Sequence, residues 1–275
     1  MPDRTVPLRP TQITKVGNLS VRIAHSAHEL TQDAVVLAQD YLQSLLEQQD
    51  TVSIILATGN SQLKFLEGIV NANKLDWSRI ILFHLDEYLG IAAAHPGSFR
   101  YYLHHKLEQR VQPHKFNYIE GDAPQPLLEC SRYSKLLQQQ SIDLCLLGIG
   151  DNGHLAFNEP SVADFQDSAT VKLVKLETTT RQQQVNGGYF PNLASVPNYA
   201  YTLTIPTICA AKKIFCLAGG NHKTEVVRQT LQNAIAPSFP ATILRTLPQA
   251  TLFCTVGSYQ LIGQLPRAQG DVACN

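Results

Sequence analysis

The order of segments along this 275-residue chain predicts an α/β fold, with a mostly parallel sheet covered by helices on both faces. Two observations lead to this class. Short runs rich in apolar and β-branched residues alternate with longer stretches whose apolar residues recur every three or four positions. Several of the runs end in glycine-containing turns that lead directly into the next helical stretch.

The expected strands are residues 19–23, 52–57, 79–85, 142–147, 201–205, 213–218 and 250–256. The expected helices are residues 27–48, 62–73, 98–110, 129–140 and 223–233. The first 17 residues show no clear period and are expected to form an irregular lead-in. We find no internal repeat or break in composition, so residues 1–275 are expected to form a single three-layer, Rossmann-like domain. Residues 160–198 are polar with few apolar repeats, and they predict a loop or helical lid over an active site.

Composition excludes several classes of protein. Lys+Arg and Asp+Glu both number 22, and this balance argues against nucleic acid or an anionic membrane surface as the main partner. The hydrophobic content of 44% is too high for a disordered chain. No apolar run approaches the roughly 20 residues of a membrane span, and the N-terminal stretch lacks the apolar region of a signal peptide. We therefore expect a soluble cytoplasmic protein.

The cysteines are expected to be structural. They contain no CxxC pair and no histidine at zinc-finger spacing, so we expect small buried side chains in a reducing compartment and no metal site. They are Cys130, Cys145, Cys209, Cys216, Cys254 and Cys274.

Polar residues gather after four of the expected strands, where ligands bind in parallel α/β sheets. After the strand at 52–57 comes Thr58-Gly59-Asn60-Ser61, a turn that opens a helix. Its backbone N–H groups and the positive end of the helix dipole suit a phosphate, although an ordinary capped turn has the same composition. It matches neither common nucleotide-binding glycine motif.

Asp86-Glu87-Tyr88 follows the strand at 79–85. Charge at the half-buried end of a strand must be compensated, so a helix cap or a core ion pair is one interpretation. The other is a general base whose pocket tunes its pKa towards neutrality.

The third cluster is Gly148-Ile-Gly-Asp-Asn-Gly-His-Leu-Ala-Phe-Asn-Glu-Pro160, which follows the strand at 142–147. Its glycines allow the backbone to approach a ligand closely. His154 and Glu159 lie in this loop with Asn152, and a histidine in such surroundings favours a catalytic function over a structural one. The fourth cluster, Gly219-Gly-Asn-His-Lys223, opens a helix, and Lys223 could face the same anion as the first turn.

These motifs resemble the glucosamine-6-phosphate deaminase family of the broader deaminase/6-phosphogluconolactonase superfamily. The similarity rests on LGIGDNGHLAFNEP, on FHLDEYLGI and HPGSF upstream, and on VPNYAYTLTIPTI downstream, and it extends from about Ser53 to Gln232. It implies conversion of D-glucosamine 6-phosphate and water to D-fructose 6-phosphate and ammonia in amino-sugar catabolism. It implies no metal or organic cofactor.

The resemblance also implies roles for individual residues. Asp86 would be the base that moves a proton between C2 and C1 of the open-chain sugar through a cis-enolamine. His154 would open the pyranose ring, and Glu159 would orient it. Asn152 stands where some members have a supporting aspartate. The phosphate would be held by the turn from Thr58 to Ser61 (Thr58, Gly59, Asn60 and Ser61), together with Arg181 and Lys223.

The chain departs from the family pattern in three places. Gly59-Asn60 replaces two small residues, residues 161–170 lack the basic cluster of allosterically regulated members, and residues 260–275 match nothing recognisable. A 6-phosphogluconolactonase, a galactosamine 6-phosphate substrate and a non-catalytic sugar-phosphate sensor are the alternatives. Asp86 and the Asn-Glu-Pro sequence favour the deaminase. The sequence leaves open a monomer or a homo-oligomer.

Overall fold

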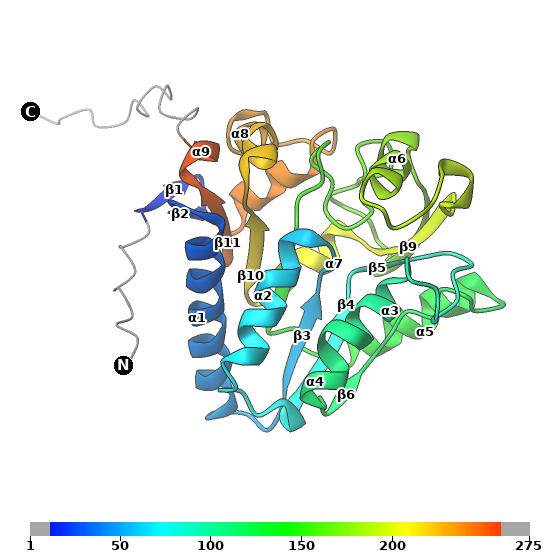
Figure 1. Cartoon of the computed structure of the whole chain (residues 1–275), viewed down its shortest axis with the longest axis horizontal. Helices are drawn as coiled ribbons and strands as arrows, with labels where there is room; N and C mark the ends of the chain where they lie inside the picture. The colour runs from blue at the N-terminus through cyan, green and yellow to red at the C-terminus, as the bar shows by residue number, and fades with distance from the viewer. Residues whose placement is uncertain (1–11, 260–275) are drawn as a thin grey trace, which may run out of the picture.

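The computed structural model describes residues 12–259, and its main feature is an eight-stranded sheet (Figure 1). The strands lie in the order β1 (Gln12–Val16), β2 (Leu19–Ala24), β11 (Ala250–Thr255), β10 (Ile214–Ala218), β7 (Leu144–Leu147), β3 (Val52–Leu56), β4 (Ile80–His84) and β6 (Lys115–Phe116). All neighbours are parallel except β1 and β2. The predicted α/β class and mostly parallel sheet are confirmed.

The expectation of an irregular lead-in is wrong for residues 12–16. They form β1, which pairs antiparallel with β2 from Gln12 opposite Ile23 to Val16 opposite Leu19. The remaining residues of the lead-in, 1–11, lie outside the described residues. The hydrophobic pattern does not predict β1 because it is an edge strand whose residues are mostly exposed. Such a strand needs no alternating apolar face.

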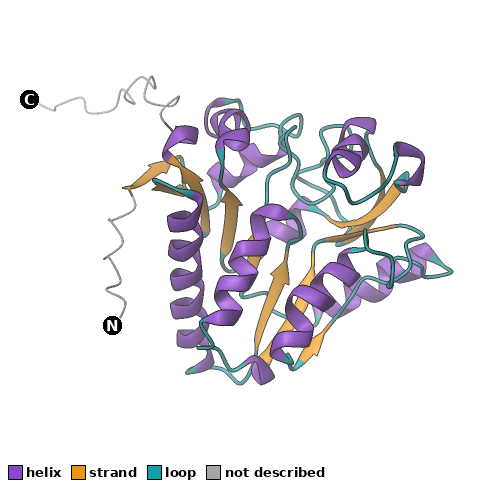
Figure 2. Cartoon of the chain, viewed as in Figure 1, coloured by secondary structure: helices purple, strands orange, loops and turns teal. Residues whose placement is uncertain are grey.

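Helices cover both faces of the sheet (Figure 2). One face packs against α1 (Ala27–Leu46), α2 (Asn60–Asn71) and a broken helix of α3 (Phe99–Leu103), a π-helical turn (His104–Glu108) and α4 (Gln109–Val111). The other face packs against α5 (Pro126–Gln138), α7 (Ile205–Cys209), α8 (Thr224–Gln232) and the 3₁₀ segment Pro240–Thr246. Strand β3 shows why both faces are apolar, because Ile54 and Leu56 enter the first core while Ile55 enters the second.

A smaller antiparallel sheet lies beside the carboxyl end of β4. It consists of β5 (Asp86–Tyr88), β9 (Tyr199–Leu203) and β8 (Val171–Lys175). Helix α6 (Thr178–Asn186) and the 3₁₀ turn Leu193–Ser195 connect β8 to β9. The segment expected to be a lid therefore contains a strand and a helix as well as loops, and Figure 1 shows α6 above the ends of the central strands.

The topology itself marks a place for a ligand. β3 and β7 are neighbours, but the chain leaves β3 towards β4 and β6 and leaves β7 towards β10 and β11. Such a reversal opens a crevice between the loops that follow the two strands. The turns at Thr58 and at Gly148 both lie at this crevice.

The described cysteines do not line the pocket at this crevice. Of the five that the structure describes, all are free and all but Cys209 are buried, while Cys274 lies outside the described residues. Burial raises the pKa of each of these five thiols above its usual value. No helix within residues 12–259 is both long enough and apolar enough to cross a bilayer.

Candidate active site

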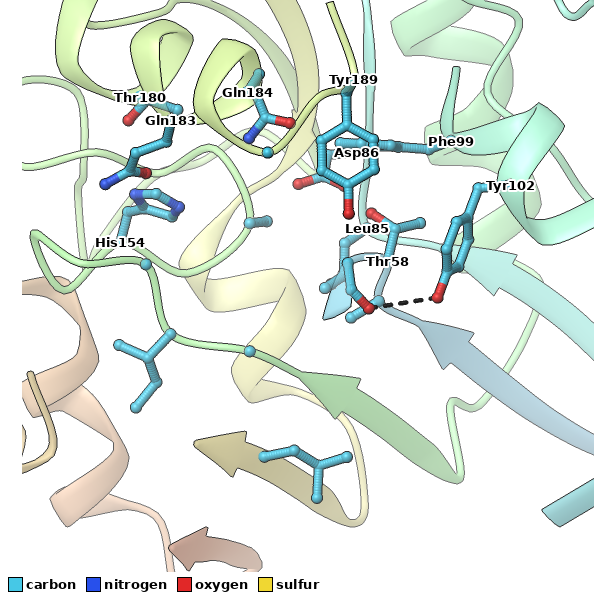
Figure 3. Close-up of a pocket in the computed structure, with 18 of the residues that line it drawn as sticks. Thr58, Leu85, Asp86, Phe99, Tyr102, His154, Thr180, Gln183, Gln184 and Tyr189 are labelled. Atoms are coloured by element: carbon cyan, nitrogen blue, oxygen red, sulfur yellow. Dashed lines mark hydrogen bonds between the residues drawn. The ribbon is translucent and has the colours of Figure 1, made fainter. Parts of the chain in front are cut away.

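A pocket of about 500 Å³ opens at the carboxyl ends of the central strands. All four polar clusters predicted from the sequence contribute to its wall: Thr58 and Gly59 after β3, Asp86 after β4, Gly150 and His154 after β7, and Gly220 and Lys223 after β10. Figure 3 shows Asp86 and His154 on opposite sides of this space, with α6 residues Thr180, Gln183 and Gln184 above them. The volume is that of a small-molecule site.

Asp86 and Glu87 are adjacent in the chain but have different surroundings. Asp86 lines the pocket and is 8% exposed, whereas Glu87 is fully buried and turned away from it. Burial, and secondarily the neighbouring Glu87 carboxylate, raise the pKa of Asp86 well above its usual range. A carboxylate of this kind is a strong base when it is ionised, which suits it to proton abstraction from carbon.

The Glu87 carboxylate fastens the start of α3. It accepts hydrogen bonds from the Ser98 hydroxyl at 2.7 Å and from the backbone N–H groups of Tyr88, Phe99 and Arg100 at 2.9–3.1 Å. The Arg100 guanidinium lies 3.8 Å away. Burial raises the pKa of Glu87, and these donors oppose that rise. The helix-cap interpretation of the carboxylate pair is therefore confirmed for Glu87.

His154 is held by its own loop. Its Nδ1 lies 2.7 Å from Asn152 Oδ1, and its ring lies so close to Gly150 that a Cβ there would be 2.0 Å from the ring. Within residues 12–259, Nε2 has no hydrogen-bond partner and is the nitrogen left for a ligand. Burial, and then the Lys223 ammonium, lower the pKa of His154 to about 4, so the neutral imidazole prevails at physiological pH.

Glu159 is not placed as the sequence predicted. Its carboxylate is fully buried, accepts a hydrogen bond from the Glu177 backbone N–H at 2.7 Å, and does not line the pocket. Burial raises its pKa, against the effects of Thr180 and the Glu177 N–H. In the structure, the residue that holds the His154 ring is Asn152, and Asn152 in turn contacts the side chain of Glu177.

The expected phosphate turn has a suitable backbone. Gly59 and Gly220 precede the first helical residues after β3 and β10, with φ of 97° and 96°, values that favour glycine. The Tyr102 hydroxyl donates to the Gly59 carbonyl at 3.3 Å, the contact drawn in Figure 3. Asn60 and Ser61 begin α2, which turns its N-terminal end to the pocket, but their side chains lie outside the described part of the structure.

The two predicted cations have different positions. Lys223 lines the pocket, and its ammonium contacts the Ile149 carbonyl at 2.9 Å and the Asp151 carboxylate at 2.7 Å. Arg181 does not line the pocket. Its guanidinium donates to the carbonyls of Leu193 and Val196 and so fastens α6 to the turn before β9. The structure does not bring Arg181 to the phosphate turn.

Several lining residues were missed by the motif search. Lys64, in the first turns of α2, is a second cation in the pocket wall. Gln183 lines the wall from α6 and donates to Asp151 at 2.8 Å, while Tyr102 and Tyr189 form an aromatic side (Figure 3). These residues occupy no recognisable motif, and only the packing of α2, α3 and the lid segment in space reveals them. Residues 12–259 contain no group of three or more His, Cys, Asp or Glu side chains arranged to hold a metal ion.

Comparison with known proteins identifies the family. The sequence model described as glucosamine-6-phosphate isomerases/6-phosphogluconolactonase matches residues 25–253. The chain belongs to this family. Among its curated members, a glucosamine-6-phosphate deaminase of Exiguobacterium is 31% identical over 93% of this chain and 96% of its own length. The deaminase of Lysinibacillus sphaericus is 39% identical over 72% of this chain and 86% of its own.

Solved structures of the family agree with the fold. A monomeric glucosamine-6-phosphate deaminase superposes with a TM-score of 0.80 at 30% identity, covering 88% of this chain and 99% of the other. A 6-phosphogluconolactonase of Thermotoga maritima gives a TM-score of 0.69 at 19% identity, covering 86% of this chain and 98% of the other. The second likeness concerns the fold alone.

Proposed function

We propose that this protein is a glucosamine-6-phosphate deaminase, which converts D-glucosamine 6-phosphate and water to D-fructose 6-phosphate and ammonia. The observation that carries the proposal is the pairing of Asp86 and His154 across one pocket, each with an environment suited to proton transfer. Lactone hydrolysis has no need of a carbon base at Asp86, and a sensor has no need of either group.

The phosphate binds between the turns that follow β3 and β10 in this proposal. The Gly59 turn supplies backbone N–H groups at the N-terminus of α2, and Lys223 and Lys64 supply positive charge from two helices. The phosphate then competes with Asp151 for the Lys223 ammonium, because that contact already occupies it. The sugar extends from this end towards Asp86, His154 and the α6 side chains.

The reaction begins with ring opening. Neutral His154 accepts the proton of the anomeric hydroxyl at Nε2 and returns a proton to the ring oxygen, which leaves an open-chain aldehyde. Ionised Asp86 then removes the C2 proton. The C–H electrons form the C1–C2 double bond while the carbonyl electrons move to O1, which gives an enolamine with a negative charge on O1. Asp86 delivers its proton to C1, and the amino nitrogen loses a proton to O1, which yields the 2-imino sugar with a C1 hydroxyl. Water adds to C2 of that imine, and ammonia leaves to give the ketose.

The chain itself supplies all pocket residues named here, so a monomer and a homo-oligomer are both compatible with the reaction. We also propose a cytoplasmic location, since the five described cysteines are free thiols, as in proteins of reducing compartments.

The first test of the proposed function is release of ammonia from glucosamine 6-phosphate with formation of an equal amount of fructose 6-phosphate. Hydrolysis of 6-phosphogluconolactone in place of ammonia release would overturn the proposal.

The Asp86→Asn variant tests the proposed base. Loss of a general base should lower kcat by about 10²–10⁴-fold while the Kd for the sugar phosphate changes less than tenfold. The matched control is Asp33→Asn, a carboxylate paired with Arg22 outside the pocket. Because the ionised form of Asp86 is required and its pKa is raised, kcat/KM should fall with decreasing pH above the ordinary aspartate range. Full activity of Asp86→Asn would remove this residue from the mechanism.

A further inference from the structure

Behind the His154 ring lies a short chain of hydrogen bonds that ends at a carboxylate. His154 Nδ1 lies 2.7 Å from Asn152 Oδ1, and Asn152 Nδ2 lies 3.3 Å from Glu177 Oε2. The second Glu177 oxygen accepts from the Ser161 hydroxyl at 2.8 Å. The chain thus joins the glycine-rich loop after β7 to the residue that precedes α6.

The directions of these bonds are fixed by their ends. An ionised carboxylate only accepts, so the Asn152 amide must turn its NH₂ group to Glu177 and its oxygen to His154. The His154 backbone N–H, 3.2 Å from the same oxygen, requires the same orientation. Nδ1 therefore carries the proton, and Nε2 keeps its lone pair for the pocket.

An asparagine next to the imidazole can orient it but brings no charge. When His154 takes a proton from the sugar it becomes a cation, and burial and then the Lys223 ammonium disfavour that form. Of the carboxylates that act on His154, Asp151 is already paired with Lys223, while Glu177 has no cationic partner within residues 12–259. Glu159, the carboxylate expected from the sequence, contacts neither His154 nor Asn152.

We propose that Glu177 is the positioning carboxylate of the active site, which acts through Asn152 to orient His154 and to stabilise its protonated form during ring opening. This inference rests on the proposed function for the ring-opening step. It explains how a chain with a neutral Asn152 beside its histidine still has a negative charge near the imidazole. The charge is on Glu177, which is separated from His154 by one hydrogen-bonded side chain. The contribution of Glu177 to the pKa of His154 has the expected sign, because it raises that pKa.

The Glu177→Gln variant separates charge from shape. The glutamine amide oxygen can still accept from Asn152, and the substitution removes no capping bond because the Glu177 side chain does not cap α6. We expect kcat to fall about tenfold to a hundredfold with KM changed less than threefold, the loss typical of groups that orient a metal-binding histidine. NMR titration should show the His154 imidazole protonating at lower pH than in the wild type. The Ser161→Ala control breaks only the other hydrogen bond of Glu177, and its kcat should stay within threefold of the wild type.

The double variant Asn152→Asp/Glu177→Gln provides the decisive test. It places the negative charge directly beside His154 Nδ1, and the amide introduced at position 177 can donate a hydrogen bond to the new carboxylate. Both kcat and the pKa of His154 should therefore be higher than in Glu177→Gln. Wild-type behaviour of Glu177→Gln, or a double variant no better than the single one, would overturn the inference. The titration needs no substrate, so it stands even if the wild type releases no ammonia, an outcome that would refute only the proposed function.

Discussion

Gly150 offers a sharp test of how the fold positions His154. A Cβ at residue 150 would lie 2.0–2.3 Å from three atoms of the imidazole, far inside the 3.5–4.0 Å of an ordinary contact. The backbone of Gly150 does not have positive φ, so alanine is compatible with its conformation. In Gly150→Ala the new Cβ therefore overlaps with the His154 ring, and the ring must move by more than about 1 Å to relieve the overlap.

That displacement breaks the 2.7 Å contact with Asn152 and misplaces Nε2. Misplacement of a catalytic group by about 1 Å costs roughly 10²-fold in rate, so we expect kcat to fall about 100-fold. The stability change should be small, because the lost hydrogen bond costs about 1 kcal/mol and replacement of glycine by alanine returns a similar amount. Steady-state ammonia release and urea unfolding measure the two effects.

Gly219→Ala is the matched control. Gly219 also follows a central strand and lines the pocket, but a Cβ there would meet only the Leu30 methyl group at 3.2 Å, which can move. Its kcat should remain within threefold of the wild type. Activity of Gly150→Ala within twofold of the wild type, or equal losses in the two variants, would refute the reasoning.

Two further predictions concern groups outside the reacting centre. Burial lowers the pKa of His84 to about 3. Below pH 6.5 the unfolded chain therefore binds a proton at this residue that the folded chain does not. The free energy of unfolding should fall by about 2 kcal/mol between pH 7.5 and pH 5 because of His84. Urea unfolding of wild type and His84→Gln at both pH values isolates this loss, and an equal pH dependence in the two proteins would contradict it. For Arg181→Ala we expect a lower Tm and a Kd for the sugar phosphate within threefold of the wild type, because the guanidinium holds the carbonyls of Leu193 and Val196. A tenfold weaker Kd measured by calorimetry would instead assign Arg181 to the phosphate.

The sequence was most informative where local chemistry and topology agree. Buried parallel strands require continuous apolar runs, so the ends of β3, β4, β7 and β10 could be located to within a residue or two. Because parallel strands end at the same edge, the polar clusters after them could be placed in one pocket. The pocket positions of Asp86, His154 and Lys223 were predicted in this way.

The rest depended on distances in space that the sequence does not contain. Glu159 is five residues from His154 in the chain, but Glu177, which is much further along, is the carboxylate that reaches Asn152. Arg181 faces away from the pocket because one side of α6 packs over the turn before β9 while Gln183 and Gln184 face inward. The lid strand β8 was missed because it belongs to a small sheet with partly exposed residues.

Because Glu87 caps α3, it connects the pocket wall to the pKa of Asp86. The segment Pro96–Phe99 that lines the pocket also supplies two of the donors that hold the Glu87 carboxylate. After burial, the Glu87 charge is the second cause of the raised pKa of Asp86. Because these donors stabilise the Glu87 anion, a change in their positions would alter the pKa of Asp86. The shape of this part of the pocket wall and the proton affinity of Asp86 are thereby linked through one buried anion, which does not itself line the pocket.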